Sequence, residues 1–242
     1  MIGIVVNVLS VVVGGLLGTL FGARMSTRFT QELNKVFGVC AMGMGISMIP
    51  QMQNMPAVIL ALVLGSCLGL AVHLGQWISR GGECMEKPIS LLLKGSTENG
   101  MAREEYLSLL VTAIVLFCSS GTGIYGCLDA GMTGSSTVLL AKSVLDLFTA
   151  MVFACSLGAV VSVIAVPQFV IFFGLFLAAK AIFPLTTPVM IADFKACGGF
   201  LLVATGCRMA KIQEFPIADM LPAMVLVMPL SALWVSCIVP LL

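Results

Sequence analysis

Long apolar stretches separated by short polar segments make up most of this 242-residue chain. A helix needs about 20 apolar residues to cross the hydrocarbon core of a bilayer, and this criterion predicts an all-α bundle of about eight transmembrane spans. The predicted spans are residues 2–23, 36–50, 56–74, 106–122, 138–162, 168–185, 194–207 and 220–241. The second and the seventh are short and contain glycine, so we expect them to be tilted, broken or buried among other helices.

Composition excludes two broad classes of protein. The chain is 60% hydrophobic and 10% charged, whereas soluble domains carry about 25% charged residues. A water-soluble globule is therefore excluded. Twelve basic residues balance eleven acidic ones, which leaves a net charge of +1. Because nucleic-acid binding depends on clustered positive charge, that class of partner is excluded as well.

The sequence contains no recognisable catalytic or metal-binding motif. The nine cysteines are odd in number, no two form a C-x-x-C pair, and most lie in apolar runs, so we expect free thiols. The only histidine, His73, has no potential ligand at helical spacing, which argues against a metal site. A Ser/His/Asp set, an H-E-x-x-H motif and a phosphate loop are all absent. We therefore expect no enzyme activity, no metal and no cofactor.

The distribution of basic residues predicts the orientation in the membrane. Lys and Arg near the ends of spans are retained on the cytoplasmic side. Nine of the twelve basic residues lie in the first, third and seventh connections: Arg24, Arg28, Lys35, Arg80, Lys87, Lys94, Arg103, Arg208 and Lys211. These connections should be cytoplasmic, which places both termini outside.

A weak internal repeat suggests how the spans are organised. The second predicted span and its approach match the seventh at one constant offset: Glu32, Gly38, Gly45 and Met48 correspond to Asp193, Gly199, Gly206 and Met209. If the first three spans match the last three, the two copies cross the membrane in opposite directions, as in many secondary transporters. The alternative is that glycine-bearing helices resemble one another for packing reasons.

This interpretation divides one membrane domain, residues 1–242, into four parts. Residues 1–75 and 166–242 are the two repeat halves, and residues 106–165 are the central spans in a 3+2+3 arrangement. Residues 76–105 form a cytoplasmic linker, which is either an amphipathic helix on the inner leaflet or a solvated spacer. The halves should superpose after a rotation of about 180° about an axis in the membrane plane.

Glycines mark two further features. Gly14, Gly18 and Gly22 in the first span, and Gly65 and Gly69 in the third, are four residues apart, a spacing that lets helix backbones approach closely in lipid. The polar stretch after Phe117 contains Gly121, Gly123, Gly126 and Gly131, and we expect these glycines to interrupt the helix. That stretch is either a re-entrant segment buried in protein or an ordinary outer loop.

The best single pointer to function is a pair of charges inside the fifth apolar run. Lys142 and Asp146 are four residues apart, so on a helix they share a face and can pair. Ionisable groups within spans are costly and usually face a bundle interior or a cavity. A purely structural ion pair is the alternative. Asn7, with Ser10 on the same face of the first span, either bonds to a neighbouring helix or lines a cavity.

Several motifs resemble a bacterial inner-membrane family, domain of unknown function 554. These are the opening M-I-G-x-x-x-N, the segment from Phe117-Cys118 to Leu128-Asp129-Ala130-Gly131, and L-L-A-K-S-x-L-D at 139–146. The resemblance covers essentially the whole chain and implies a multi-pass protein of the bacterial inner membrane. The positions that carry it are Asn7, Cys118, Gly121, Asp129, Gly131, Lys142, Ser143 and Asp146.

The leading hypothesis is a small secondary transporter or channel-like permease for an unidentified small solute or ion. Its intramembrane polar site would comprise Asn7, Asp129, Lys142, Ser143 and Asp146. The alternative is a non-transporting scaffold or regulator whose glycine stripes pack against a partner. The lipid bilayer is the other expected partner, and the sequence leaves a homodimer open.

Overall fold

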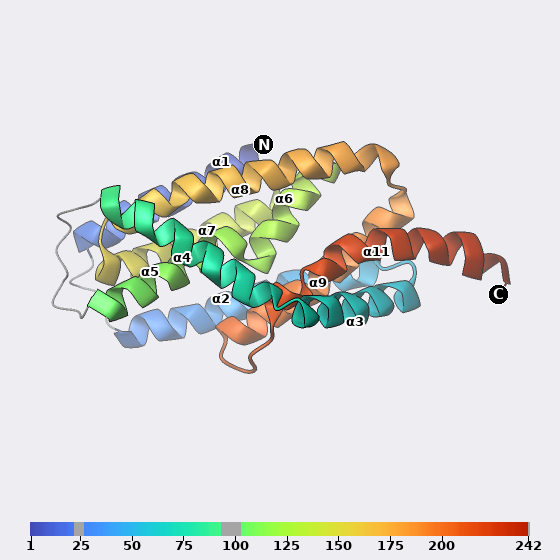
Figure 1. Cartoon of the computed structure of the whole chain (residues 1–242), viewed down its shortest axis with the longest axis horizontal. Coiled ribbons are helices and arrows are strands. Elements are labelled where there is room, and N and C mark those ends of the chain that lie inside the picture. Colours follow the sequence, from blue (N-terminus) through green and yellow to red (C-terminus); the bar gives the residue numbers. More distant parts are fainter. Residues whose placement is uncertain (22–26, 93–102, 242) are drawn as a thin grey trace. The chain divides into compact units, whose positions relative to one another are not determined.

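The computed structural model describes residues 1–21, 27–92 and 103–241, and no strand occurs among them. The helices, labelled in Figure 1, are α1 (Ile2–Phe21), α2 (Thr27–Met48), α3 (Met55–Ala71), α4 (Leu74–Leu92), α5 (Arg103–Ser119), α6 (Gly121–Thr133), α7 (Thr137–Leu157), α8 (Val160–Ile182), α9 (Pro188–Met209), α10 (Ile217–Met220) and α11 (Pro222–Leu233). Single 3-10 turns at Ile49–Gln51, Phe183–Leu185 and Val239–Leu241 and a π-helical turn at Trp234–Ile238 complete them. The all-α class is confirmed.

The described part of the chain contains six or seven candidate membrane-spanning segments, against the eight predicted. Six helical segments in the described chain are long and apolar enough to cross a membrane: Ile2–Leu20, Leu109–Thr133, Thr137–Leu157, Val160–Leu185, Pro188–Met209 and Ile217–Ile238. A seventh is added if α3 and the first part of α4, which are bent by 57° at their junction, form one span. His73 lies in this junction in a left-handed backbone conformation, with φ of 56°.

The two spans predicted to be short are in fact long helices. Both α2 and α9 contain 22 residues. The apolar part of α2 is preceded in the same helix by a polar stretch with Arg28, Glu32 and Lys35, which is why α2 is not among the six apolar segments. The start of α9 is fixed by Pro188 at the first helical position and by Thr187, whose hydroxyl accepts a hydrogen bond from the Met190 N–H.

The boundary between the fifth and sixth spans lies earlier than predicted. The sequence pattern placed it between residues 162 and 168, next to Pro167, but α8 begins at Val160 and contains Pro167 in its interior. The chain turns instead at Gly158, which has φ of 72° and follows the end of α7. Glycine adopts this conformation without the steric cost that other residues incur, so it ends the helix more effectively than the proline does.

The glycine-rich stretch is helical, which corrects the prediction that its glycines interrupt the helix. Helix α6 runs from Gly121 to Thr133, and the interruption lies one residue earlier, at Ser120. The Ser120 hydroxyl accepts a hydrogen bond from the Gly123 N–H and so caps α6. At the other end, Gly134 has φ of 75°, ends α6 and begins the turn into α7. No outer loop therefore occupies residues 123–133.

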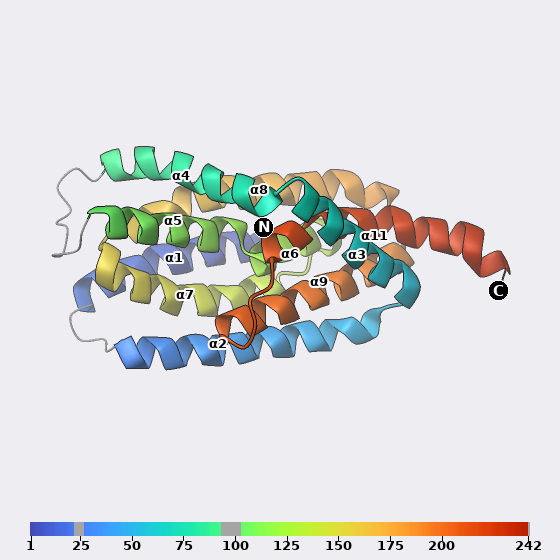
Figure 2. The same ribbon diagram turned by 60° about the horizontal axis from the view of Figure 1, so that its bottom comes forward.

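The chain forms two compact units, and each is discontinuous in sequence. Unit 1 contains residues 1–34 and 77–180, and unit 2 contains residues 35–76 and 181–242. Unit 1 is organised around α1, which lies beside α7 (Figure 2). The core of unit 1 contains large apolar side chains from α5 and α8, among them Phe117 and Ile164.

Glycines bring α1 against two neighbours in unit 1. A β-carbon at Gly14 would overlap the carbonyl oxygen of Leu147, and one at Gly18 would overlap that of Met151, both in α7. Because the later residue of α1 meets the later residue of α7, the two helices run parallel. On its other side α1 meets α8, where the Ser162 hydroxyl donates to the Val12 carbonyl at 3.1 Å. The third glycine of the predicted stripe, Gly22, lies outside the described residues.

In unit 2, glycine contacts join α2 to α9 and α3 to the C-terminal helices. A β-carbon at Gly38 would lie 2.6 Å from the Gly206 carbonyl oxygen, and one at Gly199 would lie 2.7 Å from that of Gly45. Because the earlier glycine of α2 meets the later glycine of α9, the two helices are antiparallel. Gly65 packs against the backbone of Ala223, and Gly69 packs against that of Asp219.

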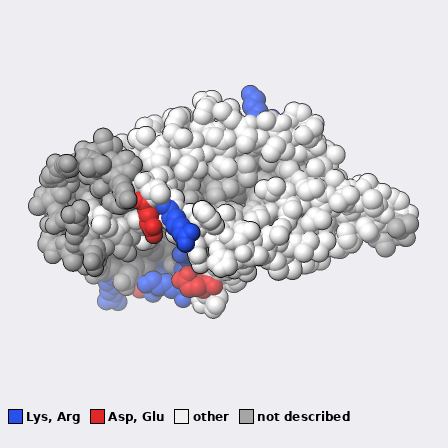
Figure 3. All heavy atoms as spheres, viewed as in Figure 1, with Lys and Arg blue, Asp and Glu red and all other residues white. Residues whose placement is uncertain are grey.

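The described surface is predominantly uncharged. Figure 3 shows one face on which Lys, Arg, Asp and Glu occupy only a few places, while most of the remaining described atoms belong to other residue types. Large apolar side chains are exposed along the helices, for example Leu20, Val166 and Val225. An exposed apolar surface of this kind matches a hydrocarbon environment.

The close contact between α1 and α7 can be tested with one methyl group. We expect Gly18→Ala to lower the free energy of unfolding by about 1–3 kcal/mol, because the methyl group meets a backbone carbonyl that cannot move aside. Gly43→Ala in α2 is the matched control, since no atom lies within 4 Å of its β-carbon position. Thermal unfolding of the purified protein in detergent should show a lower midpoint for Gly18→Ala alone. Equal midpoints would contradict the close contact.

Candidate functional site

A buried ion pair lies in the middle of α7. Lys142 Nζ is 2.7 Å from Asp146 Oδ1 and 2.6 Å from Asp146 Oδ2. The two residues are one helical turn apart, and only 3% of Lys142 and 6% of Asp146 is exposed. The structure thus brings together the two charges at the predicted helical spacing. Because the pair is enclosed by protein, its charges are compensated by each other rather than by water.

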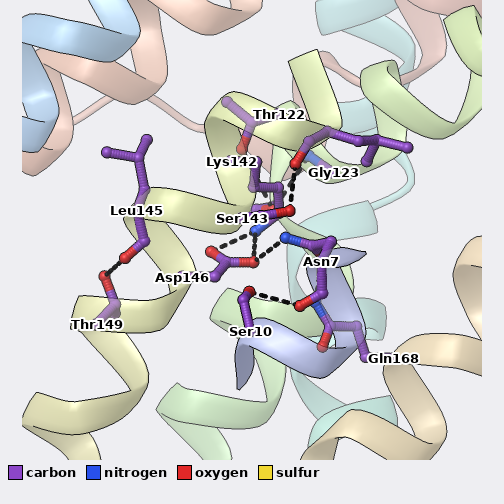
Figure 4. Close-up of polar contacts among 12 residues, drawn as sticks. Asn7, Ser10, Thr122, Gly123, Lys142, Ser143, Leu145, Asp146, Thr149 and Gln168 are labelled. Atoms are coloured by element: carbon purple, nitrogen blue, oxygen red, sulfur yellow. Dashed lines mark hydrogen bonds and ion pairs between the residues drawn. The ribbon is translucent and has the colours of Figure 1, made fainter. Parts of the chain in front are cut away.

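Asn7 connects the pair to α1. Its Nδ2 donates to Asp146 Oδ2 at 2.9 Å, so the carboxylate accepts three hydrogen bonds in all, two from Lys142 and one from Asn7. The Ser10 hydroxyl donates to the backbone carbonyl of Asn7 at 2.6 Å and holds this turn of α1 (Figure 4). Of the two roles considered for Asn7, the structure supports hydrogen bonding to a neighbouring helix.

Gln168 of α8 extends the same network and was missed in the sequence. Its Nε2 donates to Asn7 Oδ1 at 2.9 Å, and both Asn7 and Gln168 are fully buried. A signal was present, because Gln168 is the only polar side chain between Ser162 and Lys180 of α8. Its partner Asn7 lies 161 positions away in the sequence, so spacing alone does not reveal the partnership.

Two other predicted site residues point elsewhere. The Ser143 hydroxyl donates to the Leu139 carbonyl of its own helix at 2.7 Å. Asp129 is buried near the end of α6, where the Thr133 hydroxyl donates to its backbone carbonyl at 2.9 Å and to its Oδ1 at 3.1 Å. The described network therefore joins Asn7, Lys142 and Asp146 with Gln168, whereas these bonds of Ser143 and Asp129 stay within single helices.

The α6 glycines shape the surroundings of the pair. A β-carbon at Gly123 would lie 2.5 Å from Phe172 Cζ and 3.0 Å from Lys142 Cε, so only glycine allows the first turn of α6 to approach this lysine. Gly126 meets Leu139 of α7, and Gly131 meets the backbone of α8 at Phe176. Lys142 consequently lies beside the positive end of the α6 dipole, and the Asp146 carboxylate offsets both positive charges.

A second buried carboxylate, also missed, organises unit 2. Asp193 of α9 accepts hydrogen bonds from the backbone N–H groups of Gln53 and Asn54, from Asn54 Nδ2 and from the Ser231 hydroxyl, at 2.6–2.9 Å. These N–H groups belong to the two residues that immediately precede α3, so Asp193 ties the start of α3 to α9. In the predicted internal repeat, Asp193 appeared only as the residue that corresponds to Glu32.

The described residues offer no metal centre. They contain no group of three or more His, Cys, Asp or Glu residues arranged to hold a metal ion. All nine cysteines are free thiols. The network itself supplies one ion pair, Lys142 with Asp146, and the amide hydrogen bonds of Asn7 and Gln168.

The ion pair makes a stability prediction that distinguishes single from double substitutions. We expect Lys142→Met to lower the free energy of unfolding by about 3–5 kcal/mol, because it leaves the Asp146 charge buried without a cation. The double variant Lys142→Met/Asp146→Leu should lose far less, since no charge is left uncompensated. Chemical unfolding in detergent measures both. Additive losses in the double variant would show that the two side chains do not act as a pair.

Comparisons with known proteins identify the family of the chain. It is 44% identical over 235 residues to the Escherichia coli (strain K12) "Uncharacterized protein YqgA", covering 97% of this chain and 98% of that protein. It is 24% identical over 232 residues to the Bacillus subtilis (strain 168) "Uncharacterized membrane protein YdfK", covering 93% of each. No solved structure matches the chain. The six apolar helices agree with the membrane location in the second name. Residues 2–232 match the family model described as "Protein of unknown function (DUF554)", and the chain belongs to that family.

Proposed function

We propose that the protein is a small secondary transporter or permease, and that the Lys142–Asp146 pair is the centre of its polar site. The observation that carries the proposal is a hydrogen-bonded charge network from three helices, enclosed within an apolar bundle. Ionisable groups inside membrane spans are costly to retain and mark substrate or ion pathways in many transporters. The proposal assigns no chemical reaction to the chain.

The weak internal repeat in the sequence gives independent support. The constant offset that relates Gly38 to Gly199 also relates Gly45 to Gly206. If the two copies of the repeat are exchanged, Gly38 takes the place of Gly199 and Gly206 takes the place of Gly45. The Gly38–Gly206 contact then becomes the Gly199–Gly45 contact, and both contacts are present. A two-fold axis perpendicular to the antiparallel helices α2 and α9 has this property. Such an axis would lie in the membrane plane, as it does in transporters with inverted repeats.

The enclosure of the pair is also what a second candidate function, a scaffold or regulatory protein, requires. With 3% and 6% exposure, Lys142 and Asp146 are closed off from solvent in this conformation. A transporter passes through such a closed state between its two open ones, whereas a scaffold or regulatory protein would retain it permanently. Under the second candidate, the network only holds α1, α7 and α8 together.

Transport by reconstituted protein separates the two candidates. We expect the double variant Lys142→Met/Asp146→Leu to fold and insert, since it leaves no buried charge uncompensated, but to lose solute flux, because it removes the charges at the centre of the site. Flux into vesicles is measured over a panel of small metabolites and ions, with and without a pH gradient. Asp219→Asn is the matched control: Asp219 accepts from the Gly75 N–H at 2.8 Å in unit 2, outside the network. Absence of flux above protein-free vesicles under all conditions would favour the scaffold.

We also propose an orientation in the bacterial inner membrane, with the connection between α9 and α10 in the cytoplasm and both termini outside. The basic residues Arg208 and Lys211 of that connection motivate this assignment. In a cysteine-free background, Gln51→Cys should react with a membrane-impermeant thiol reagent in intact cells, whereas Gln213→Cys should react only after lysis. Both positions are exposed in the structure. The opposite labelling pattern would reverse the orientation.

A further inference from the structure

One fully buried polar atom in the network has no hydrogen-bond partner among the described residues. This atom is Oε1 of Gln168, which lies in α8 with 0% exposure. Buried side-chain acceptors are normally satisfied, and an unsatisfied one in a native protein calls for an explanation such as a bound water or ligand. Because no water is available in the hydrocarbon region outside the protein, the explanation must lie within the bundle.

The identity of the unsatisfied atom follows from the charge of Asp146. An ionised carboxylate only accepts hydrogen bonds, so Asn7 must turn its Nδ2 toward Asp146. Asn7 Oδ1 then faces Gln168, which must turn its own Nε2 toward it (Figure 4). Rotating either amide by 180° would bring two acceptors together. Gln168 Oε1 is therefore left facing away from the network, and the free position requires a hydrogen-bond donor.

Two further features strengthen the demand for a donor at this position. Each amide donates toward the carboxylate, and such a chain of hydrogen bonds polarises its members, which makes the terminal oxygen a better acceptor. The preceding residue, Pro167, has no N–H group, so the Val163 carbonyl one turn earlier does not receive the usual helical hydrogen bond. Helix α8 therefore lacks one of its usual backbone hydrogen bonds in the turn that precedes Gln168.

The charge of the site restricts the ligand. Lys142 and Asp146 neutralise each other, and adding a charged group to an enclosed neutral pair would leave one charge without compensation. A ligand that enters this network without disrupting it is therefore uncharged. It must also carry an O–H or N–H group, because the vacant position on Gln168 is an acceptor.

From these observations we propose that Gln168 is a substrate-selecting residue, whose Oε1 accepts a hydrogen bond from a small uncharged solute of the amide or alcohol type. This inference rests on the proposed transport function and narrows its substrate class. Asn7 and Asp146 hold the Gln168 amide in the orientation that selects for a donor. Internal water has the same hydrogen-bonding chemistry, so the test must distinguish water from solute.

The first experiment measures selectivity by flux. Vesicles containing the full-length protein are given acetamide, urea, glycerol, acetate or sodium, and acetamide uptake is also measured in competition with N,N-dimethylacetamide, which lacks an N–H group. We expect saturable uptake of an uncharged donor that does not respond to an imposed membrane potential, since no net charge moves. Uptake of charged probes alone, or equal competition by acetamide and its dimethylated form, would overturn the proposal.

The second experiment uses a substitution at Gln168 to separate substrate selection by this residue from a merely structural role. Gln168→Met has a similar length but no acceptor, so acetamide uptake should fall about tenfold and the preference for acetamide over its dimethylated form should disappear. Thermal unfolding in detergent checks that the variant is folded. Ser162→Ala is the matched control on α8, because it removes a hydrogen bond to α1 outside the network. Unchanged discrimination in folded Gln168→Met would refute the proposal.

A high-resolution experimental structure of the full-length protein tests the site independently of transport. We expect density at about 2.7–3.2 Å from Gln168 Oε1, and we expect soaked acetamide to occupy it. If acetamide binds there while every flux measurement is negative, the transport function fails and the donor site stands. An empty position, or a single water that no solute displaces, would overturn the substrate assignment.

Discussion

The bilayer offers no water to a buried polar group, and this constraint determines how the interior of the protein is arranged. Backbone groups satisfy it by forming helices. Three buried hydroxyl groups satisfy it by donating to their own helix: Ser143, Thr149 and Thr205 each bond to the carbonyl four residues earlier, at 2.7–2.8 Å. The amides of Asn7 and Gln168 and the carboxylates of Asp146 and Asp193 have partners on other segments of the chain, and their positions therefore determine which helices meet.

The two units meet this constraint in different ways. In unit 1 a cation neutralises the buried carboxylate of Asp146, and two amides continue the hydrogen bonding to α1 and α8. In unit 2 the described donors to Asp193 are uncharged backbone, amide and hydroxyl groups. The Asp193 arrangement fixes the start of α3, which is a structural role. The Asp146 arrangement ends in a free acceptor, and that difference is why the functional proposal rests on unit 1.

Local sequence signals predicted the helical class and the pairing of Lys142 with Asp146, because both depend on neighbours within one helix. The network beyond the pair could not be read from spacing, since Gln168 and Asn7 lie on helices far apart in the sequence. The prediction for α6 failed for a different reason. Glycine weakens helices in water, but in lipid an unwound backbone loses hydrogen bonds that nothing replaces. The α6 glycines serve close packing instead.

The placement of both charges on α7 has a consequence for biosynthesis. Helices enter the membrane in the order in which they are made, so α1 arrives long before its partners α7 and α8. The network residue that it carries into the bilayer, Asn7, is uncharged and costs far less than a lone ion. Lys142 and Asp146 arrive together on one helix and can neutralise each other by local pairing at insertion. This pair therefore enters the bilayer without exposing an uncompensated charge to lipid as α7 inserts.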